Sequence, residues 1–504
     1  MGEPATTARH RARRLAGLVG AGVLGVLGAT LVVLTGGRLA LGPVVTPPTA
    51  WFGLLDPVAD NQPSLLPAVL ILGAALLVGA WWWVCRSCQR GELSVRAVVI
   101  LITCWSAAPL IGPPILSLDV YSYVAQGAMV SAGFDPYTAG PALLGNAPAA
   151  LAADPIWANT PSPYGPVGLG LFHAVAAVTG GHVLSAVILL RVVAAIAVAA
   201  LAWCVTRAVP TARRPFALAA GVGGPVVLLE LLGAVHLEAV MMALAAAGLL
   251  AVLRGRVGLG LALLTAAALT KWPAAVILVV LVARRWADLA AGREPGWARR
   301  LAAAVGRDVA VVAVTASALS LLVPDGLGWL RAASTPSLGL SLYSPVSALA
   351  NLIAMVSGEP GAAVAGSEPL RLARTVGMVA AVLVIGWLLL TVRRRDPLST
   401  CGIALLTLAL LGPVLYPWYL AWGTVPLAMA AGPRRRLLTV VGGLGALLSV
   451  PHPELLFVGR PWLTQWFSRD GPVVLVALVA CAVAAVLARR RLARRPVGER
   501  TRAA

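Results

Sequence analysis

Charge is scarce in this sequence, and lysine is scarcer still. Only 12% of the 504 residues are charged, and Lys271 is the single lysine among 39 basic residues. A chain with 59% hydrophobic residues has too few polar side chains to hide its apolar surface in a soluble core. The sequence therefore predicts an all-α polytopic membrane protein and excludes a water-soluble one.

Several sequence motifs are also missing. The chain contains no Gly-rich nucleotide-binding loop, no serine nucleophile elbow and no zinc motif. The six cysteines form no disulfide framework, because most of them fall within apolar runs. No repeat of fixed period is visible, and the two halves lack the inverted symmetry expected in many secondary transporters.

Apolar runs long enough to cross a membrane recur along the whole chain, with no separate soluble domain between them. A spanning helix needs about 20 apolar residues, and we expect about 14 spans, within a range of about 12 to 16. We therefore expect one integral membrane domain, 1–504. The expected spans are 15–36, 65–84, 97–116, 183–206, 215–233, 236–253, 257–270, 272–284, 304–323, 370–392, 399–416, 417–432, 437–451 and 472–488, and the apolar pieces 166–180 and 340–357 are expected to be re-entrant or to lie along the outer face.

The arginines give the orientation. A net charge of +20 would suggest a nucleic-acid partner in a soluble protein, but here the arginines lie in short clusters between apolar runs, which is the positive-inside pattern. We expect no nucleic-acid partner, cytoplasmic termini and a basic cytoplasmic tail at 489–504. The expected cytoplasmic clusters are 9–14, 86–96, 207–214, 254–256, 284–307, 393–395, 434–436 and 489–495, and the expected outer segments are 37–64, 117–182, 324–369 and 452–471.

The outer loop 117–182 is the segment richest in signal. Asp119 lies at its start, and the loop carries no Lys or Arg. Its prolines impose extended and turned backbone, and it offers side chains that hydrogen-bond or stack with sugars. Asp119 is interpreted as a catalytic base or, alternatively, as an acidic helix cap. Asp135 and Asp154 each precede a proline, which is typical of residues that form turns. The sugar-binding candidates in this loop are Gln126, Tyr137, Trp157, Asn159 and Tyr164.

Three tight outer turns carry the remaining polar candidates. His236 and Glu238 cap an apolar helix, either as a solvated cap or as groups that bind sugar or acceptor. Lys271 lies between two apolar half-segments, where it either faces a phosphate or extends to the membrane interface. The turn 416–419 either lines a pocket or belongs to the aromatic belt of the interface. Arg191, Arg331, Arg371, Arg374 and Arg460 are further outward-facing cations.

The motifs together resemble a known family. DVYSYVAQG from Asp119, GFDPYTAGP from Gly133 and PSPYGP from Pro161 are similar to the first outer loop of the polyprenol-phosphate-mannose-dependent α-1,6-mannosyltransferases of actinobacterial lipomannan assembly. The similarity continues through HLEAVMMAL at 236–244, TKWP at 270–273 and YPWYLAW at 416–422. One departure is Leu237, where the family pattern is expected to carry Asn.

This resemblance implies a C-type glycosyltransferase fold with a large catalytic first outer loop. It also implies inverting transfer of mannose from polyprenyl-phosphate-mannose to an α-1,6-mannan acceptor, such as lipomannan, on the outer face of the cell membrane. Asp119 would be the general base, with a pKa raised by desolvation at the membrane edge. The implied substrate-binding residues are Tyr121, Tyr123, Gln126, Asp135, Tyr137, Tyr164, His236, Glu238, Lys271, Tyr416, Trp418 and Tyr419.

Other readings stay open at this point. The resemblance implies no certain cofactor and no protein-bound metal site, and it leaves open whether a divalent cation helps to hold the phosphate. The choice of mannose over another lipid-linked pyranose rests on the resemblance. A transporter or flippase for a lipid-linked sugar, or a structural protein of the envelope, would share the apolar helices, although a transporter usually places polar groups near the bilayer midplane.

Overall fold

The structure is a computed structural model that describes residues 3–40, 51, 65–292, 295–338, 341, 344–358, 366–430 and 435–449. Within these residues the secondary structure is helical and contains no strand. The expected span 472–488, the outer segment 452–471 with Arg460, and the basic tail 489–504 lie outside the described residues.

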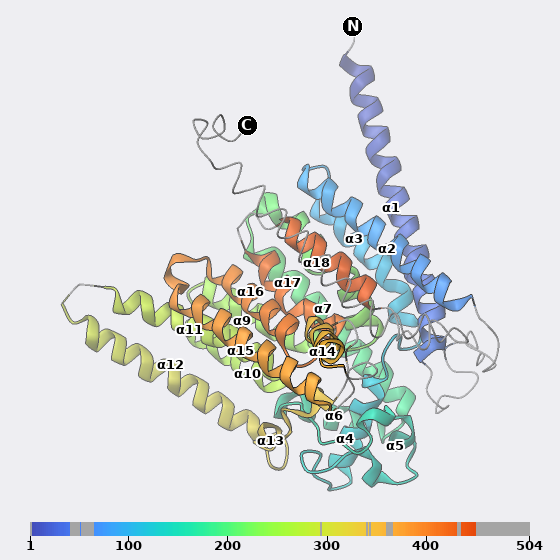
Figure 1. Ribbon diagram of the computed structural model, residues 1–504. Coiled ribbons are helices and arrows are strands. Elements are labelled where there is room, and N and C mark those ends of the chain that lie inside the picture. Colours follow the sequence, from blue (N-terminus) through green and yellow to red (C-terminus); the bar gives the residue numbers. More distant parts are fainter. Residues whose placement is uncertain are drawn as a thin grey trace. The chain divides into compact units, whose positions relative to one another are not determined.

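The chain divides into two compact units. The first comprises Met1–Gly339, Ala381–Ala409 and Tyr416–Pro451. In this unit α1 packs against α2 and α3, α4 packs on α6, and α10 contacts α9, α11 and α12 (Figure 1). Its helices are α1 (Glu3–Ala40), α2 (Leu66–Gln89), α3 (Val95–Ile111), α4 (Asp119–Ser131), α5 (Pro148–Ala152), α6 (Pro166–Thr179), α7 (Val183–Ala208), α8 (Arg214–Gly221), α9 (Glu238–Leu253), α10 (Val257–Thr270), α11 (Ala275–Ala290), α12 (Trp297–Ser320), α13 (Trp329–Ala332), α17 (Leu420–Met429) and α18 (Arg435–Leu448).

The second unit comprises Leu340–Ala380, Leu410–Leu415 and His452–Ala504. It contains α14 (Pro345–Val356) and the first half of α15 (Glu368–Leu390). Its core is a cluster of small and branched apolar side chains from these two helices. The cluster consists of Val346, Ala350, Leu370 and Ala373, with Leu349 and Ile353 packed against it. The remaining helix, α16 (Pro397–Leu411), has most of its residues in the first unit.

Five helices in the described part of the chain are long and apolar enough to cross a membrane. They lie within α1, α2, α7, α12 and α15, and a bent pair formed by residues 227–233 and α9 would add a sixth. Several other expected spans are apolar helices of only 10–17 residues, among them α3, α10 and α16. The membrane character is thereby supported, whereas the expected number of about 14 spans is not confirmed.

The prediction of one continuous span at 215–233 is wrong. Helix α8 ends at Gly221, and a π-helical segment, Val227–Gly233, begins after a break. The break falls at residues 222–224, directly before Pro225, and proline disfavours helical backbone in the residue before it. The π-helix is then bent by 113° from α9. The predicted tight turn at 235–238 therefore exists and joins two helices that are far from collinear.

Glycines set the distance between α9 and α10. A Cβ atom added at Gly260 would lie 2.4 Å from the Val252 side chain and 2.9 Å from the backbone oxygen of Gly248. The two helix backbones therefore touch at these small residues, as is common where membrane helices pack closely. Gly258, on the same helix, has nothing within 4 Å of such an atom.

These two neighbouring glycines allow a matched test of the packing. Gly260→Ala forces α9 and α10 apart, and we expect it to destabilise the protein by about 1–3 kcal/mol, the usual cost of overpacking. Gly258→Ala meets open space and improves helix propensity, so it should leave the unfolding temperature unchanged or raise it. Thermal unfolding of the two purified variants in one detergent checks this, and equal unfolding temperatures would contradict the described contact.

Candidate active site

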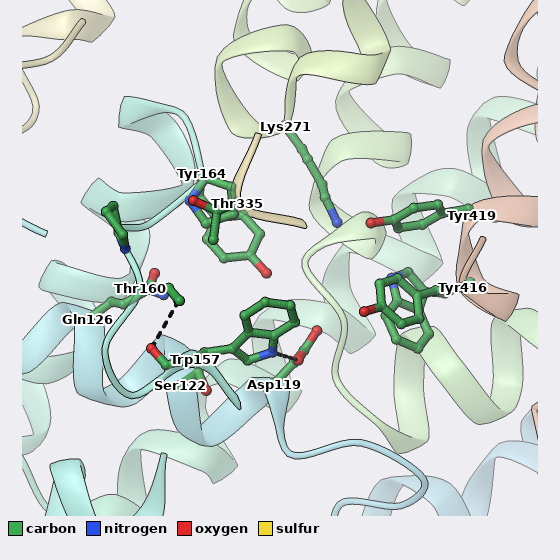
Figure 2. A pocket seen from close by; sticks show the side chains of 13 residues that line it. Asp119, Ser122, Gln126, Trp157, Thr160, Tyr164, Lys271, Thr335, Tyr416 and Tyr419 are labelled. Carbon is green, nitrogen blue, oxygen red and sulfur yellow. Dashed lines mark hydrogen bonds between the residues drawn. The ribbon is translucent and has the colours of Figure 1, made fainter. Parts of the chain in front are cut away.

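A pocket with about 470 Å³ of empty space, part of it open to solvent, lies in the first unit. Figure 2 shows the ammonium group of Lys271 and the hydroxyl groups of Tyr164 and Tyr419 directed toward the same space as the carboxylate of Asp119. The lining comes from α4, the loop after it, the α10–α11 junction, the short segment Thr335–Leu338 and the turn before α17. It consists of Asp119, Ser122, Gln126, Trp157, Thr160, Pro161, Pro163, Tyr164, Lys271, Thr335, Tyr416, Trp418 and Tyr419.

Asp119 stands at the first residue of α4. The backbone before it turns sharply at Leu116, whose φ of +63° lies in the left-handed region, and the hydroxyl of Ser117 accepts a hydrogen bond from the Asp119 amide at 3.1 Å. The N-terminal end of a helix favours a negative charge. One carboxylate oxygen, Oδ1, accepts a hydrogen bond from the Trp157 indole at 3.3 Å, and the other, Oδ2, lies 3.4 Å from Nδ1 of His236.

The expectation that burial raises the pKa of Asp119 is wrong in its direction. Desolvation is the largest single influence and raises it, but the contact with His236, the positive charge of that ring, the charge of Lys271 and the hydrogen bond from Trp157 together lower it by more. The pKa of the Asp119 carboxyl therefore lies below its ordinary value. Sequence reasoning saw the apolar residues before Asp119 and could not see the cations that fold against it.

His236 is completely buried and lies between two carboxylates. Its Nε2 atom is 3.3 Å from Oε2 of Glu230, and Nδ1 faces Asp119. The ring stacks on Trp418 with centroids 3.7 Å apart, and Trp418 in turn stacks on Tyr416 at 4.7 Å. The alternative of His236 as a solvated helix cap is thereby excluded.

Lys271 is also buried, so the alternative in which its side chain extends to the membrane interface is excluded as well. Its ammonium group donates a hydrogen bond to Glu238 at 2.5 Å. It lies 5.5 Å from the ring centre of Tyr164 and 4.9 Å from that of Tyr419, which is within the range of cation–π attraction. A buried ammonium needs such compensation, and here a carboxylate and aromatic rings supply it.

The Pro-rich part of the loop between α4 and α6 is fixed to the end of α10. The Gly165 amide donates to the Thr270 carbonyl at 3.3 Å, and a Cβ atom at position 165 would lie 2.0 Å from the Leu269 backbone oxygen. Ser162 donates to the side-chain oxygen of Gln126 at 2.9 Å. The wall formed by 161–165 is therefore held in contact with the segment that carries Lys271.

Some predicted residues lie away from the lining. Tyr123 is buried and stacks on Phe172 at 4.6 Å, which places it behind Tyr164. Asp135 caps a turn by accepting from the Tyr137 amide at 2.9 Å, as its position before a proline indicates. Tyr121 and Tyr137 are buried, and neither is among the lining residues. His236 and Glu238 stand directly behind the lining and hold Asp119 and Lys271.

Other predicted cations are engaged with backbone or surface partners. Arg191 is buried, and its guanidinium donates to the carbonyls of Leu110, Gly112 and Gly233. Arg331 pairs with Asp325 at an exposed site. In the second unit, Arg374 donates to the Pro413 carbonyl. Lys271 is thus the cationic side chain that lines the described pocket.

The sequence reasoning missed several site residues. Ser122, Thr160 and Thr335 line the pocket but belong to no recognisable motif. Glu230 is the most informative omission. It interrupts the apolar run LLELLG, and an acidic residue inside an expected membrane helix is a signal of function that could have found it. Among the described residues no group of three His, Cys, Asp or Glu side chains could hold a metal ion.

The fold and the site define a class. Apolar helices, several of them long enough to cross a membrane, together with a pocket lined by a carboxylate, an ammonium group and aromatic rings have the make-up of a membrane glycosyltransferase. A family model described as "Alpha-(1->6)-mannopyranosyltransferase, N-terminal domain" matches residues 22–288, and one described as "MptB C-terminal domain" matches residues 346–490. The chain belongs to the α-(1→6)-mannopyranosyltransferase family.

Curated relatives agree with this assignment. The chain is 32% identical to alpha-(1->6)-mannopyranosyltransferase A of Mycobacterium tuberculosis, over 80% of this chain and 79% of that protein. It is 30% identical to a probable alpha-(1->6)-mannopyranosyltransferase of Mycolicibacterium smegmatis, over 80% and 78%. It is 29% identical to alpha-(1->6)-mannopyranosyltransferase B of Corynebacterium glutamicum, over 81% and 72%. No solved structure matches the chain.

The Lys271–Glu238 pair gives a test of the site's electrostatics. Lys271→Met or Glu238→Met alone leaves one buried charge without its partner, which costs about 3–5 kcal/mol of stability. The double variant replaces the pair by apolar side chains and should recover most of this loss. Thermal unfolding of the two single variants and the double variant measures the coupling. Losses that simply add in the double variant would show that the two groups do not interact.

Proposed function

We propose that this protein transfers mannose from polyprenyl-phosphate-mannose to an α-1,6-mannan acceptor on the outer face of the cell membrane, with inversion at the anomeric carbon. Family membership supports mannosyl transfer, and the names of the relatives support an α-1,6 linkage. The observation that carries the mechanism is the position of Asp119 and Lys271 on one pocket. The arginine clusters of the sequence support a pocket that faces outward, in a C-type glycosyltransferase fold with cytoplasmic termini.

Asp119 is the general base of this proposal. A single displacement joins the acceptor oxygen to the anomeric carbon as the bond from that carbon to the phosphate oxygen breaks. The acceptor hydroxyl loses its proton to the Asp119 carboxylate, and the phosphate leaves with the bonding electrons. Because the pKa of Asp119 lies below its ordinary value, the carboxylate is ionised at neutral pH and ready to accept this proton.

Lys271 stabilises the leaving phosphate. Its ammonium group lines the pocket and uses one of its three N–H groups on Glu238, which leaves the others for phosphate oxygens. The neighbouring hydroxyls of Tyr164 and Tyr419 face the same space and offer further hydrogen bonds (Figure 2). A fixed cation at the leaving group lowers the energy of the transition state, because negative charge develops there.

The stacked aromatic residues and the neutral polar side chains complete the pocket. Tyr416 and Trp418 present rings, and Ser122, Gln126 and Thr160 present hydroxyl and amide groups. Sugar rings combine apolar faces with hydroxyl groups, so this mixture fits the mannosyl group and the acceptor.

Asp119→Asn tests the assignment of the base. The amide keeps the shape of the side chain but cannot take up the proton, so we expect transfer to fall by about 10²–10⁴-fold. Membranes that carry the protein are supplied with radiolabelled polyprenyl-phosphate-mannose and a short α-1,6-mannoside, and the labelled product is counted.

The matched control is Asp288→Asn, which alters an exposed carboxylate that pairs with Arg284 on α11. This variant should transfer mannose at the wild-type rate. Unchanged transfer by Asp119→Asn would remove Asp119 from the mechanism. Absence of transfer by the wild type would remove the proposed function and favour a transporter, a structural protein or a different sugar donor.

Lys271→Gln tests the phosphate contact. Loss of the cation should lower the rate of transfer by about 10²–10³-fold, because a single donor to developing charge contributes about this much. Lys271→Arg, which retains the positive charge, should lose less. Arg90→Gln removes an exposed surface cation and serves as the control. Equal rates for Lys271→Gln and the wild type would place the phosphate elsewhere.

A further inference from the structure

Glu230 is a buried carboxylate to which nothing above assigns a role in the reaction. Its side chain is 1% exposed and lies in the π-helical segment Val227–Gly233, among Val and Leu residues. A buried carboxylate is costly unless a partner compensates its charge. The partner here is His236, whose Nε2 atom lies 3.3 Å from Glu230 Oε2.

The backbone holds these two residues in one turn. The His236 amide donates to the Glu230 carbonyl at 3.2 Å, and the Ala234 amide donates to the Leu229 carbonyl at 2.8 Å. Val235, between them, has a φ of +61°, which is a strained conformation for a β-branched residue. π-helical turns and strained residues often occur at functional sites, because the surrounding structure must maintain them.

His236 connects Glu230 to the reacting carboxylate. Its second ring nitrogen, Nδ1, lies 3.4 Å from Oδ2 of Asp119. The stack on Trp418 holds the ring between the two carboxylates, with each ring nitrogen within 3.4 Å of one carboxylate oxygen. The order Glu230, His236, Asp119 therefore runs from the apolar interior to the pocket.

We propose that Glu230 is a positioning residue for sugar transfer, which acts through His236 to keep the Asp119 carboxylate ionised and aimed at the acceptor hydroxyl. This inference rests on the proposed function. Glu230 touches neither sugar nor phosphate, and its negative charge compensates a positive charge on the buried imidazole. The charged imidazole then stabilises the anionic form of Asp119.

The proton balance follows from this arrangement. The acceptor hydroxyl gives its proton to Asp119, the new bond to the anomeric carbon forms, and the bond to the phosphate oxygen breaks. Glu230 and His236 keep their own protonation states through the step, so no further proton acceptor is required.

The other charged groups near Asp119 do not replace this role. Lys271 also stabilises the carboxylate, but its charge is shared with Glu238. Asp154, on the outer loop, is acidic and has its own pKa raised, by burial first and then by the charge of Asp119. Trp157 contributes a neutral hydrogen bond to the other carboxylate oxygen, Oδ1. His236 is therefore the cationic group in direct contact with Asp119.

Glu230→Gln tests the proposal through the pH profile of kcat/KM. Transfer requires ionised Asp119 and is lost as the pH falls through its pKa, which lies below the ordinary value in the wild type. Without the charge of Glu230, the imidazole no longer stabilises the carboxylate, burial dominates, and the pKa of Asp119 rises. The acid limb should therefore move to higher pH, with activity regained as the pH is raised and with the KM for the donor unchanged.

Three further variants separate positioning from a merely structural role. His236→Gln should move the acid limb in the same direction, and the double variant with Glu230→Gln should move it no further, because both act on one path. Glu230→Asp, which keeps the charge, should restore part of the wild-type profile. Glu92→Gln, at an exposed pair with Arg90, is the matched control and should not change the profile.

The outcomes are distinguishable. If the wild type transfers mannose, two results would overturn the proposal. One is a loss of activity in Glu230→Gln that is equal at every pH, and the other is a shift of the acid limb in the double variant that equals the sum of the two single shifts. A wild type without transfer would overturn the proposed function. In that case the protonation of Asp119 can be followed by infrared spectroscopy. The C=O stretch of its protonated carboxyl is obtained as the difference between the spectrum of a protein and that of the same protein with Asp119→Asn. An unshifted titration in Glu230→Gln would overturn the inference independently of activity.

Discussion

The structure of the pocket depends on one constraint, which is that a charge removed from water must be paired. Among the described residues, five charged side chains form contacts at the pocket or directly behind its lining, and each is in contact with a group of opposite charge. Glu238 holds Lys271, Glu230 holds His236, and His236 also faces Asp119. An ion pair contributes little at an exposed surface, whereas the loss of one partner of a buried pair is costly. The five groups therefore behave as one network, in which a change at any member alters the charge that the others experience.

This network is positioned by interruptions of helices. His236 lies in the break between the π-helical segment and α9, Lys271 lies at the junction of α10 and α11, and Asp119 opens α4. An intact membrane helix satisfies its own backbone and presents mainly apolar side chains. Where a helix breaks, free backbone groups and polar side chains become available, as in the broken helices of membrane transporters. The positive φ angles at Leu116 and Val235 fall three residues before Asp119 and one residue before His236, so backbone strain lies next to the charged groups of the site.

The sequence predicted much of this site, because the signals for it are local. A carboxylate at the end of an apolar run, a Pro-rich aromatic loop and a lone lysine between two apolar half-segments each violate the pattern of a membrane helix. All three prove to line one pocket. Glu230 and the break after Gly221 were missed in the sequence. The run LLELLG has the pattern of a continuous membrane span, and the contact between Glu230 and His236 is known only from the structure. From the sequence, Asp135 and Tyr137 were assigned to the site because they lie in a motif of the same loop. In the structure, Asp135 instead accepts a hydrogen bond that stabilises a turn.

The direction of the pKa shift at Asp119 suits this carboxylate to the proposed role of general base. A raised pKa would give a stronger base, but part of the protein would then carry a protonated, inactive carboxyl near neutral pH. A lowered pKa gives a weaker base that is always available. A carboxylate that is always ionised is more useful than a stronger base when the leaving group is a phosphate, because the departure of the phosphate develops positive charge at the anomeric carbon. An acceptor hydroxyl that begins to bond to such a carbon becomes acidic, so even a weak carboxylate base can remove its proton late in the step. The pairing of buried charges and the demands of the chemistry thus favour the same state of Asp119.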